Sequence, residues 1–395
     1  MRTKKLIIFY GRFELPNGNA LAHRALANAY ILSKNGFKCI LVGYSKELNK
    51  NYPLVIDSFL PNIELHIHKY PTSLIEWFFD TYFYKKILRI IKMHNDFETT
   101  VILNDVGLSN TNNLFKKSRG QFNIICDVVD CLDYSSGGFF YKNLKNLIEK
   151  KLTYSIRPKI KNIICISKYL KLKYDEMKCN TLLLPPLTFK DDKRFILETK
   201  YNPSKIVRYC YCGNPGKKCS KDRLDWCLIA FFEISKTKKI DLKFDIFGIS
   251  KECFLIDFPE LRYIAENDKI CFHGKVDNKE CLINIANSDF FLLARENNIM
   301  TRAGFPTKIS ESLALSTPVI TTPTSDIGDY IIDGKNGLLA EDCSYQSFLK
   351  AVIRSVSLSS NSIIKMHKEM KNNNKLNTDE WQQKLLDYIE QTKRE

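Results

Sequence analysis

The sequence predicts an α/β protein built from two halves, each with its own parallel sheet. Short runs of β-branched and aromatic residues alternate with stretches of helical periodicity, which is the pattern of parallel strands joined by crossover helices. With 395 residues, the chain is also long for one hydrophobic core. The strand pattern weakens over Leu184–Tyr201, where prolines and the charged run KDDKR indicate a linker.

Strand candidates follow in order along both halves. In the first half they are Leu6–Tyr10, Cys39–Gly43, Ile63–His68, Val101–Leu103, Ile124–Cys126 and Ile163–Ile166. In the second half they are Val207–Cys212, Phe244–Phe247, Ile270–Phe272, Phe290–Ala294 and Val319–Thr322. A helix is expected over Ala20–Leu32, because apolar and small residues recur there at helical spacing.

The end of the chain predicts a connector followed by a helix. Residues 355–377 are rich in Ser, Asn and Lys, which favours a partly mobile connector. Thr378 is expected to cap the terminal helix, with Asp379 and Glu380 in its first turn. The helix has one apolar face, formed by Trp381, Leu385, Leu386 and Ile389. That face must pack on its own half or, as we expect, back on the first half.

The charge balance predicts an anionic partner. Lys and Arg outnumber Asp and Glu by 60 to 44, for a net charge of +16. This excess suits nucleotide phosphates, lipid headgroups or nucleic acid. No nucleic-acid recognition motif accompanies the charge, so we expect no nucleic-acid partner.

Cysteine usage and the N-terminus predict a cytoplasmic protein. The 13 cysteines include no CxxC pair, which favours free thiols in a reducing compartment. His66 and His68 share a strand face without a third ligand nearby, so no metal site is expected. The apolar run after Met1 is too short for a signal peptide or a membrane span.

Residues 301–339 carry the most informative motif. A polar loop with Gly304 and Pro306 leads into a short helix bearing Glu311, and Pro318 precedes the next strand. Backbone N–H groups at a helix start face an anion, and a carboxylate one turn in accepts hydrogen bonds from a ribose diol. The segment therefore predicts a nucleotide-phosphate site, although α/β scaffolds without a ligand share this order of elements.

This motif resembles the signature of the family 4 (group 1) retaining glycosyltransferases, which carry two glutamates on either side of a Gly-Phe turn. The matching positions are Gly304, Phe305, Glu311, Leu313, Ala314, Pro318, Val319, Asp333, Gly334, Asn336 and Gly337. Ala303 takes the place of the first glutamate, so the family's usual contact to the donor sugar cannot come from that residue. The segment AGFPTK resembles the corresponding segment of bacterial surface-polysaccharide transferases.

The resemblance implies a GT-B fold, with two Rossmann-like domains facing a central cleft. We expect an acceptor-binding domain over residues 1–188, a linker over 189–205, a nucleotide-sugar-binding domain over 206–376, and a helix over 377–395 that crosses back to the first domain. No GxGxxG, Walker loop or DxD triplet occurs at a strand end. The resemblance implies a nucleotide sugar as substrate, and because these motifs are absent we expect no cofactor and no metal.

Two loops are expected to contact the donor besides the motif itself. The first predicted strand ends at Gly11, where glycine allows a close backbone approach, and Asn19 lies near the following helix start. The alternative is a long loop with a turn at Asn17-Gly18.

The second loop is 213–221, where relatives carry an Arg after Gly213 and then a Lys. Asn214 takes the Arg position and Lys221 matches the Lys, while Lys218 and its neighbour Lys217 can add positive charge for the diphosphate. A solvated loop explains Lys217 and Lys218 equally well.

Arg295 and the turn after Ala303 complete the expected donor site. Arg295 directly follows a strongly apolar strand, at the edge where α/β ligands bind. The turn residues expected to contact phosphate and sugar are Gly304, Phe305, Pro306, Thr307 and Lys308. We expect Arg295 or Lys308 to compensate for Ala303.

Glu311 and Asp130 are the candidate catalytic residues. Glu311 is expected to hold the donor ribose. Asp127, Asp130 and Asp133 follow a first-half strand, and Asp130 is our candidate to orient the acceptor hydroxyl or act as base. The alternative is that these aspartates are caps and turn formers.

Two basic segments predict peripheral contact with the inner face of an anionic membrane. Leu74–Met93 mixes aromatic residues with Lys85, Lys86 and Arg89, as an interfacial amphipathic helix does. Lys142–Lys161 is a second basic run. The alternative is that the aromatic stripe faces the core.

The leading function is a retaining glycosyltransferase of the hexosyltransferase type. It moves a sugar from a nucleotide diphosphate to a lipid-linked or oligosaccharide acceptor in capsule- or O-antigen-like polysaccharide biosynthesis. One alternative is a nucleotide-sugar epimerase of the same architecture, which needs acid–base residues around the sugar. The other alternative is a catalytically silent glycan-binding subunit, because Ala303 lacks the carboxylate of the family's first glutamate.

Overall fold

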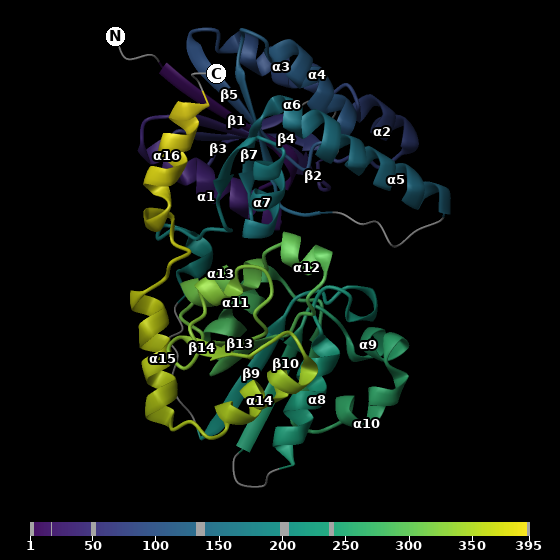
Figure 1. Cartoon of the computed structure of the whole chain (residues 1–395), viewed down its shortest axis with the longest axis vertical. Helices are drawn as coiled ribbons and strands as arrows, with labels where there is room; N and C mark the ends of the chain where they lie inside the picture. Colours follow the sequence, from purple (N-terminus) through teal and green to yellow (C-terminus); the bar gives the residue numbers. More distant parts are fainter. Residues whose placement is uncertain are drawn as a thin grey trace. The chain divides into compact units, whose positions relative to one another are not determined.

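The computed structural model describes residues 4–16, 18–48, 53–131, 139–197, 205–236 and 241–392, with the backbone alone at 139–142. It divides into two compact units (Figure 1). Unit 1 comprises Met1–Phe189 and Thr378–Glu395, and unit 2 comprises Lys190–Asn377. The assignment of acceptor to the first domain and donor to the second stays a prediction.

Unit 1 is built on a mainly parallel sheet in the order β3-β4-β2-β1-β5-β6-β7-β8. Its strands are β1 (Lys4–Glu14), β2 (Lys38–Ser45), β3 (Leu54–Asp57), β4 (Ile63–Lys69), β5 (Phe97–Asn104), β6 (Asn123–Val128), β7 (Asn162–Cys165) and β8 (Asn180–Leu183). Only β3, at the edge of the described sheet, runs antiparallel to its neighbour. Consecutive residues Leu6, Ile7 and Ile8 of β1 are all buried, so both faces of the sheet are covered.

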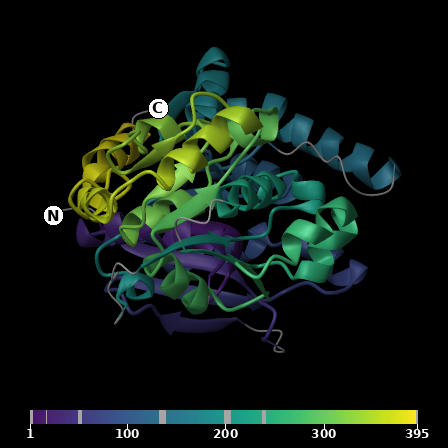
Figure 2. The ribbon, with the colours of Figure 1, turned by 90° about the horizontal axis from the view of Figure 1, so that it is seen from below.

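Helices cover the two faces of this sheet, as both ribbon views show (Figure 1, Figure 2). They are α1 (Ala20–Lys34), α2 (Leu74–Asp80), α3 (Tyr84–Met93), α4 (Leu108–Ser118), α5 (Phe139–Lys151), α6 (Arg157–Ile160), α7 (Lys168–Glu176) and α16 (Gln382–Gln391). Because α2 and α3 are separate, the predicted single helix over Leu74–Met93 is interrupted at residues 81–83.

Unit 2 has an all-parallel sheet in the order β11-β10-β9-β12-β13-β14. Its strands are β9 (Ile206–Cys212), β10 (Asp241–Phe247), β11 (Ile270–Gly274), β12 (Phe290–Leu293), β13 (Val319–Thr321) and β14 (Gly337–Leu339). Its helices are α8 (Leu224–Ser235), α9 (Lys251–Asp257), α10 (Arg262–Ala265), α11 (Asn278–Ala286), α12 (Ile299–Ala303), α13 (Thr307–Ala314), α14 (Tyr345–Ser355) and α15 (Ser360–Asn372).

The predicted α/β class with two parallel sheets is confirmed, and every predicted strand is present to within a few residues. The sequence reading missed β3, β8 and β14. These strands have only three or four residues each, which is too short for a clear periodic pattern.

The connector predicted over residues 355–377 is wrong in its central part, which forms α15. Ile363, Met366 and Met370 of α15 are buried, because they recur at helical spacing within a polar sequence. Thr378 begins a 3-10 turn that ends at Glu380, and α16 starts only after Trp381. The expected Thr378 cap of the terminal helix is therefore also wrong.

Helix α16 packs within unit 1. Leu385, Tyr388 and Ile389 are buried, and Tyr388 OH donates a hydrogen bond to the backbone oxygen of Asn180 in β8 at 2.9 Å. Of the apolar face expected from the sequence, Trp381, Leu385 and Ile389 are buried and Leu386 is half-buried.

Candidate functional site

The expected donor residues of unit 2 gather at the carboxyl edge of its parallel sheet. Gly213 follows β9, Gly248 follows β10 and Arg295 follows β12, and ligands of open parallel sheets bind at this edge. A Cβ on Gly248, which has φ of +101°, would lie 2.2 Å from the Gly213 oxygen. Only glycine fits at this close approach, so Gly213 lies in a tightly packed backbone crossing.

Arg295 is buried in a polar network at this edge. Its Nε donates to Asp222 Oδ1 at 2.7 Å, and Tyr211 OH donates to Asp222 Oδ2 at 3.0 Å. Its backbone N–H donates to Thr322 Oγ1 at 2.9 Å. The Arg295 side chain is only 5% exposed, so one role of its guanidinium is to neutralise the buried Asp222. Its contact with donor phosphate stays a prediction.

Glu311 lies one turn into α13 and forms an ion pair with Lys308. Lys308 Nζ is 2.6 Å from Glu311 Oε2, and the Glu311 side chain is 10% exposed. Burial alone would lower the pKa of Lys308, but the adjacent Glu311 carboxylate outweighs burial and the pKa is raised. Lys308 therefore stays protonated at neutral pH, and a ribose bound at Glu311 would share this carboxylate with it.

The turn before α13 is anchored by two of its residues. The Phe305 ring packs edge-on against Tyr330 with 5.4 Å between centroids, and Pro306 is buried at the cap position of α13. Gly304 and Thr307 are half-buried and thus more accessible to a ligand. Ala303 is fully buried at the end of α12, so its methyl group offers no polar contact in place of the family's first glutamate.

The loop after β9 carries three exposed lysines, Lys217, Lys218 and Lys221. The backbone N–H of Lys218 donates to Asp257 Oδ2 at 2.7 Å, which holds the loop. Asn214 accepts a hydrogen bond from a backbone N–H of the same loop at 3.0 Å, so it shapes the loop. Within the described ranges, none of the three lysines forms an ion pair. Their charges are thus available to an anion.

In unit 1, the expectation that the first strand ends at Gly11 is wrong, because β1 continues to Glu14. Gly11 pairs with Asn104 of β5, and a Cβ on Gly11 would lie 2.4 Å from the Asn104 oxygen. Asn19 caps α1: its Oδ1 accepts from the Ala22 N–H at 2.9 Å, and its Nδ2 donates to the Arg12 oxygen at 3.0 Å. Both polar ends of the Asn19 amide are therefore used by the fold. Asn17 lies outside the described residues.

The aspartates after β6 have different surroundings. Asp127 is buried and accepts hydrogen bonds from Arg24 Nη2 at 2.8 Å and from Asn104 Nδ2 at 2.8 Å. Asp130 is half-buried, accepts from the Cys131 N–H at 2.8 Å, and lines a small cavity of about 170 Å³. Asp133 lies outside the described residues. Asp127 lines the same cavity, Asp130 is the more exposed of the two, and the catalytic role of Asp130 stays a prediction.

Unit 1 also contains a pocket that the sequence reading missed. It measures about 400 Å³ and lies at the carboxyl ends of β1, β2 and β5; lining residues include Arg12, Trp77, Asp80, Asp105, Asn110 and Lys145. The Arg12 guanidinium is 5.3 Å from the centre of the Trp77 ring, and Tyr44 OH donates to Asp80 at 2.8 Å. Burial raises the pKa of Asp80, although Tyr44 and Arg12 act to lower it. Gly11 and the two basic segments Leu74–Met93 and Lys142–Lys161 all contribute lining residues, but the sequence did not indicate that they meet.

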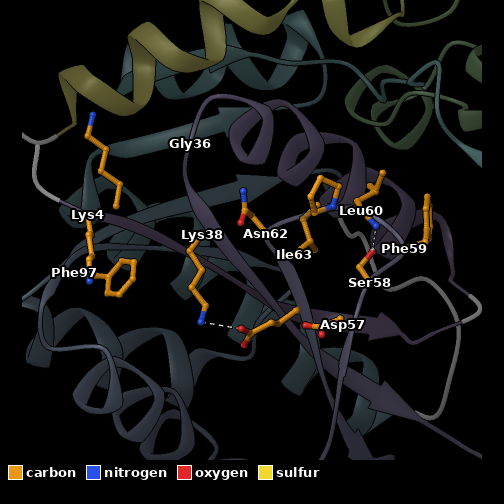
Figure 3. Close-up of a pocket in the computed structure, with 13 residues that line it drawn as sticks. Lys4, Gly36, Lys38, Asp57, Ser58, Phe59, Leu60, Asn62, Ile63 and Phe97 are labelled. Atoms are coloured by element: carbon orange, nitrogen blue, oxygen red, sulfur yellow. Dashed lines mark hydrogen bonds and ion pairs between the residues drawn. The ribbon is translucent and has the colours of Figure 1, made fainter.

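A larger cavity of about 780 Å³ lies among the amino ends of strands in the same sheet (Figure 3). Lys4, Lys38 and Phe97 line it. Lys38 is already paired with Glu64 at 2.8 Å, and none of the residues predicted from the sequence borders the cavity. We therefore do not assign it to the substrate.

All 13 cysteines are free thiols. Among the described residues, no cluster of His, Cys, Asp and Glu side chains is arranged to hold a metal ion. In the same ranges, no helix is both long enough and apolar enough to span a bilayer.

Solved structures define the class of this fold. Sucrose-phosphate synthase from Thermosynechococcus elongatus matches with a TM-score of 0.68 and 12% identity, over 98% of this chain and 99% of that chain. The E. coli trehalose-6-phosphate protein bound with UDP-2-fluoro glucose matches with a TM-score of 0.66 and 10% identity, over 99% of both chains. The apo lipopolysaccharide outer core galactosyltransferase WaaB matches with a TM-score of 0.61 and 14% identity, over 97% and 99%. The fold is the GT-B fold.

The family match lies in unit 2. Residues 207–357 match the family described as "Glycosyl transferases group 1", while no curated protein matches the sequence. Unit 2 therefore contains a segment similar to the group 1 glycosyltransferases, in a chain with the GT-B fold. This confirms the coarser part of the resemblance drawn from residues 301–339.

Changing Arg295 to Lys tests whether the guanidinium contacts the donor. Lysine keeps a cation beside Asp222 but lacks the planar fork that binds phosphate through two N–H groups. We expect the Michaelis constant for the donor to rise about tenfold, which corresponds to about 1.4 kcal/mol. Steady-state kinetics of nucleotide release would measure it. Unchanged kinetics in a folded variant would remove Arg295 from the donor site.

Proposed function

We propose that this protein is a glycosyltransferase, a retaining hexosyltransferase that uses a nucleotide-diphosphate sugar bound by unit 2. The single observation that carries the proposal is the Lys308–Glu311 pair in the first turns of α13, directly after the turn Gly304–Thr307. A carboxylate held in this way accepts hydrogen bonds from a ribose diol. The E. coli relative bound with UDP-2-fluoro glucose supports a nucleotide sugar as donor.

The lysines of the loop after β9 supply charge for the leaving group. Negative charge grows on the diphosphate as its bond to the sugar breaks, and fixed cations nearby stabilise that charge. Lys221 is our first candidate, with Lys217 and Lys218 in support. The departing diphosphate then guides the incoming hydroxyl, so the reaction needs no protein nucleophile, cofactor or metal.

We assign the acceptor to unit 1. The pocket lined by Arg12, Trp77, Asp80 and Asp105 combines an aromatic ring with carboxylates, which suits a hydroxyl-rich ligand. Asp130 stays our candidate to orient the acceptor hydroxyl. The acceptor is a lipid-linked or oligosaccharide sugar in surface-polysaccharide biosynthesis, and the match to the outer core galactosyltransferase supports this choice. We place the protein at the cytoplasmic face of the membrane.

Incubation of the purified chain with UDP-, GDP- and TDP-sugars tests this function. Free nucleoside diphosphate, even from slow hydrolysis, is the expected product. An altered sugar without release would favour the epimerase instead. Binding without either product would favour the silent glycan-binding subunit.

A further inference from the structure

Helix α2 presents apolar side chains to solvent. Leu74, Ile75, Phe78 and Phe79 are 89%, 69%, 60% and 65% exposed, and no residue of α2 is buried. The helix is nevertheless well formed, because Ser73 and Glu76 make a reciprocal capping box. An ordered, exposed apolar cluster of this kind marks an interaction surface.

A basic pocket of about 380 Å³ adjoins this cluster. Phe79 and Tyr82 line it together with Lys85, Lys86 and Arg89 of α3. Phe79 thus belongs both to the exposed apolar face and to the pocket wall. The pocket and the apolar face are therefore parts of one continuous surface.

The cations of this pocket outnumber its carboxylates. Glu76 and Asp80 also line the pocket, but Glu76 is paired with Lys69, and Asp80 acts on Lys86 without forming an ion pair. Among the described residues, Lys85, Lys86 and Arg89 form no ion pair with a carboxylate. Lys86 Nζ lies 3.4 Å from His68 Nδ1. Burial, with the charges of Lys86 and His66, lowers the pKa of His68 to about 3, so His68 stays neutral at physiological pH and does not repel these cations. The pocket therefore holds positive charge suited to a phosphate.

We propose that this pocket binds the phosphate group of a membrane lipid while the apolar face of α2 inserts into the bilayer. The inference deepens the proposed function and rests on its membrane-linked acceptor. Apolar side chains beside unpaired cations match the two chemistries of a lipid, an acyl region and an anionic headgroup. A soluble phosphate compound would use the cations but would leave the apolar side chains of α2 in water.

Vesicle co-sedimentation with paired variants tests the pocket. The probes are phosphatidylcholine vesicles containing phosphatidic acid, and vesicles brought to the same surface potential with oleate. We expect the wild-type chain to prefer phosphatidic acid. The variant Lys85→Gln/Arg89→Gln should bind these vesicles roughly 10- to 30-fold more weakly, because each cation near the surface contributes to binding. Equal binding to both vesicle types would show diffuse charge attraction and overturn the pocket.

The matched control removes two charges elsewhere. Lys365 and Lys368 are exposed on α15 of unit 2, and Lys365→Gln/Lys368→Gln should bind vesicles like the wild type. If it weakens binding as much as the pocket variant does, net charge is the cause and the proposal fails. Circular dichroism and thermal unfolding would verify the fold of each variant.

A second pair of variants tests insertion. Phe78→Ser/Phe79→Ser should also reduce vesicle binding by about tenfold or more, because it removes most of the exposed aromatic area of α2. If it has no effect, and free inorganic pyrophosphate competes fully for the pocket, the ligand is soluble and the lipid inference is overturned. Release of nucleoside diphosphate by the wild-type chain without lipid is measured separately. Release can be absent while vesicle binding persists, and vesicle binding can be absent while release persists. The two proposals can therefore fail independently.

Discussion

Glu311→Ala is expected to lower kcat/KM for nucleotide-sugar cleavage by roughly 30- to 1,000-fold. The carboxylate is proposed to accept hydrogen bonds from the ribose diol, and hydrogen bonds to charged groups are worth about 1.5–3 kcal/mol each. The change also leaves Lys308, 2.6 Å away, without its partner in the donor site. Steady-state release of nucleoside diphosphate would measure the change in kcat/KM.

Lys308→Ala is the matched control for this prediction. If Glu311 acts only by pairing with Lys308, the two variants should lose the same activity. If Glu311 contacts the ribose, Glu311→Ala alone should lose the preference for a ribose donor over its 2′-deoxyribose analogue, because Lys308 is expected to contact the phosphate and sugar instead. Because Glu311 is buried and the Lys308 side chain is only 23% exposed, breaking the pair is expected to lower the free energy of unfolding by about 3 kcal/mol, so the fold of both variants is verified before their kinetics are compared. A folded Glu311→Ala variant with near wild-type kinetics would refute the ribose contact.

Asp127→Ala is expected to lower the free energy of unfolding of unit 1 by about 3–5 kcal/mol, because it leaves a buried charge unpaired. The Asp127 and Arg24 side chains are 3% and 2% exposed and lie 2.8 Å apart. Arg24 also donates to the Pro185 oxygen at 3.0 Å, so it cannot simply turn to solvent. Urea denaturation followed by circular dichroism would measure the loss.

Asp130→Ala is the companion variant, three residues further along the chain, in the loop after β6. Asp130 is half-buried, so its replacement should change the free energy of unfolding by about 1 kcal/mol or less. Its expected effect is instead on turnover with acceptor present. A stable Asp127→Ala protein would show that the buried pair contributes little. A large loss of stability in Asp130→Ala would show that Asp130, like Asp127, stabilises the fold.

Local patterns in the sequence were sufficient to predict most of the strands and the donor motif. Consecutive apolar residues such as Phe290–Leu293 mark strands buried on both faces, and those residues are indeed buried. The order of Gly304, Glu311 and Pro318 is local, so the turn and α13 follow from neighbouring residues. The donor contacts of these residues stay predictions.

Contacts between residues that are far apart in the sequence could not be predicted from local patterns. Asp127 and Asp130 are three residues apart, Asp127 in β6 and Asp130 in the loop that follows. Asp127 pairs with Arg24, which lies 103 residues away. The unit 1 pocket combines residues of β1, α2 and α5 with others, and no spacing in the sequence relates them. Helix α15 was missed because its buried residues are few and its composition is polar.

By itself, therefore, the sequence determined the α/β class, most strand positions and the group 1 glycosyltransferase motif of unit 2. These depend on periodicity and on backbone preferences over a few residues. Only the tertiary structure decided that Gly11 lies within β1, that Asn19 is a helix cap, and that Asp127 is held by Arg24. Those roles depend on which side chains the parallel sheets bring together, and crossover connections bring together residues that are far apart in the chain.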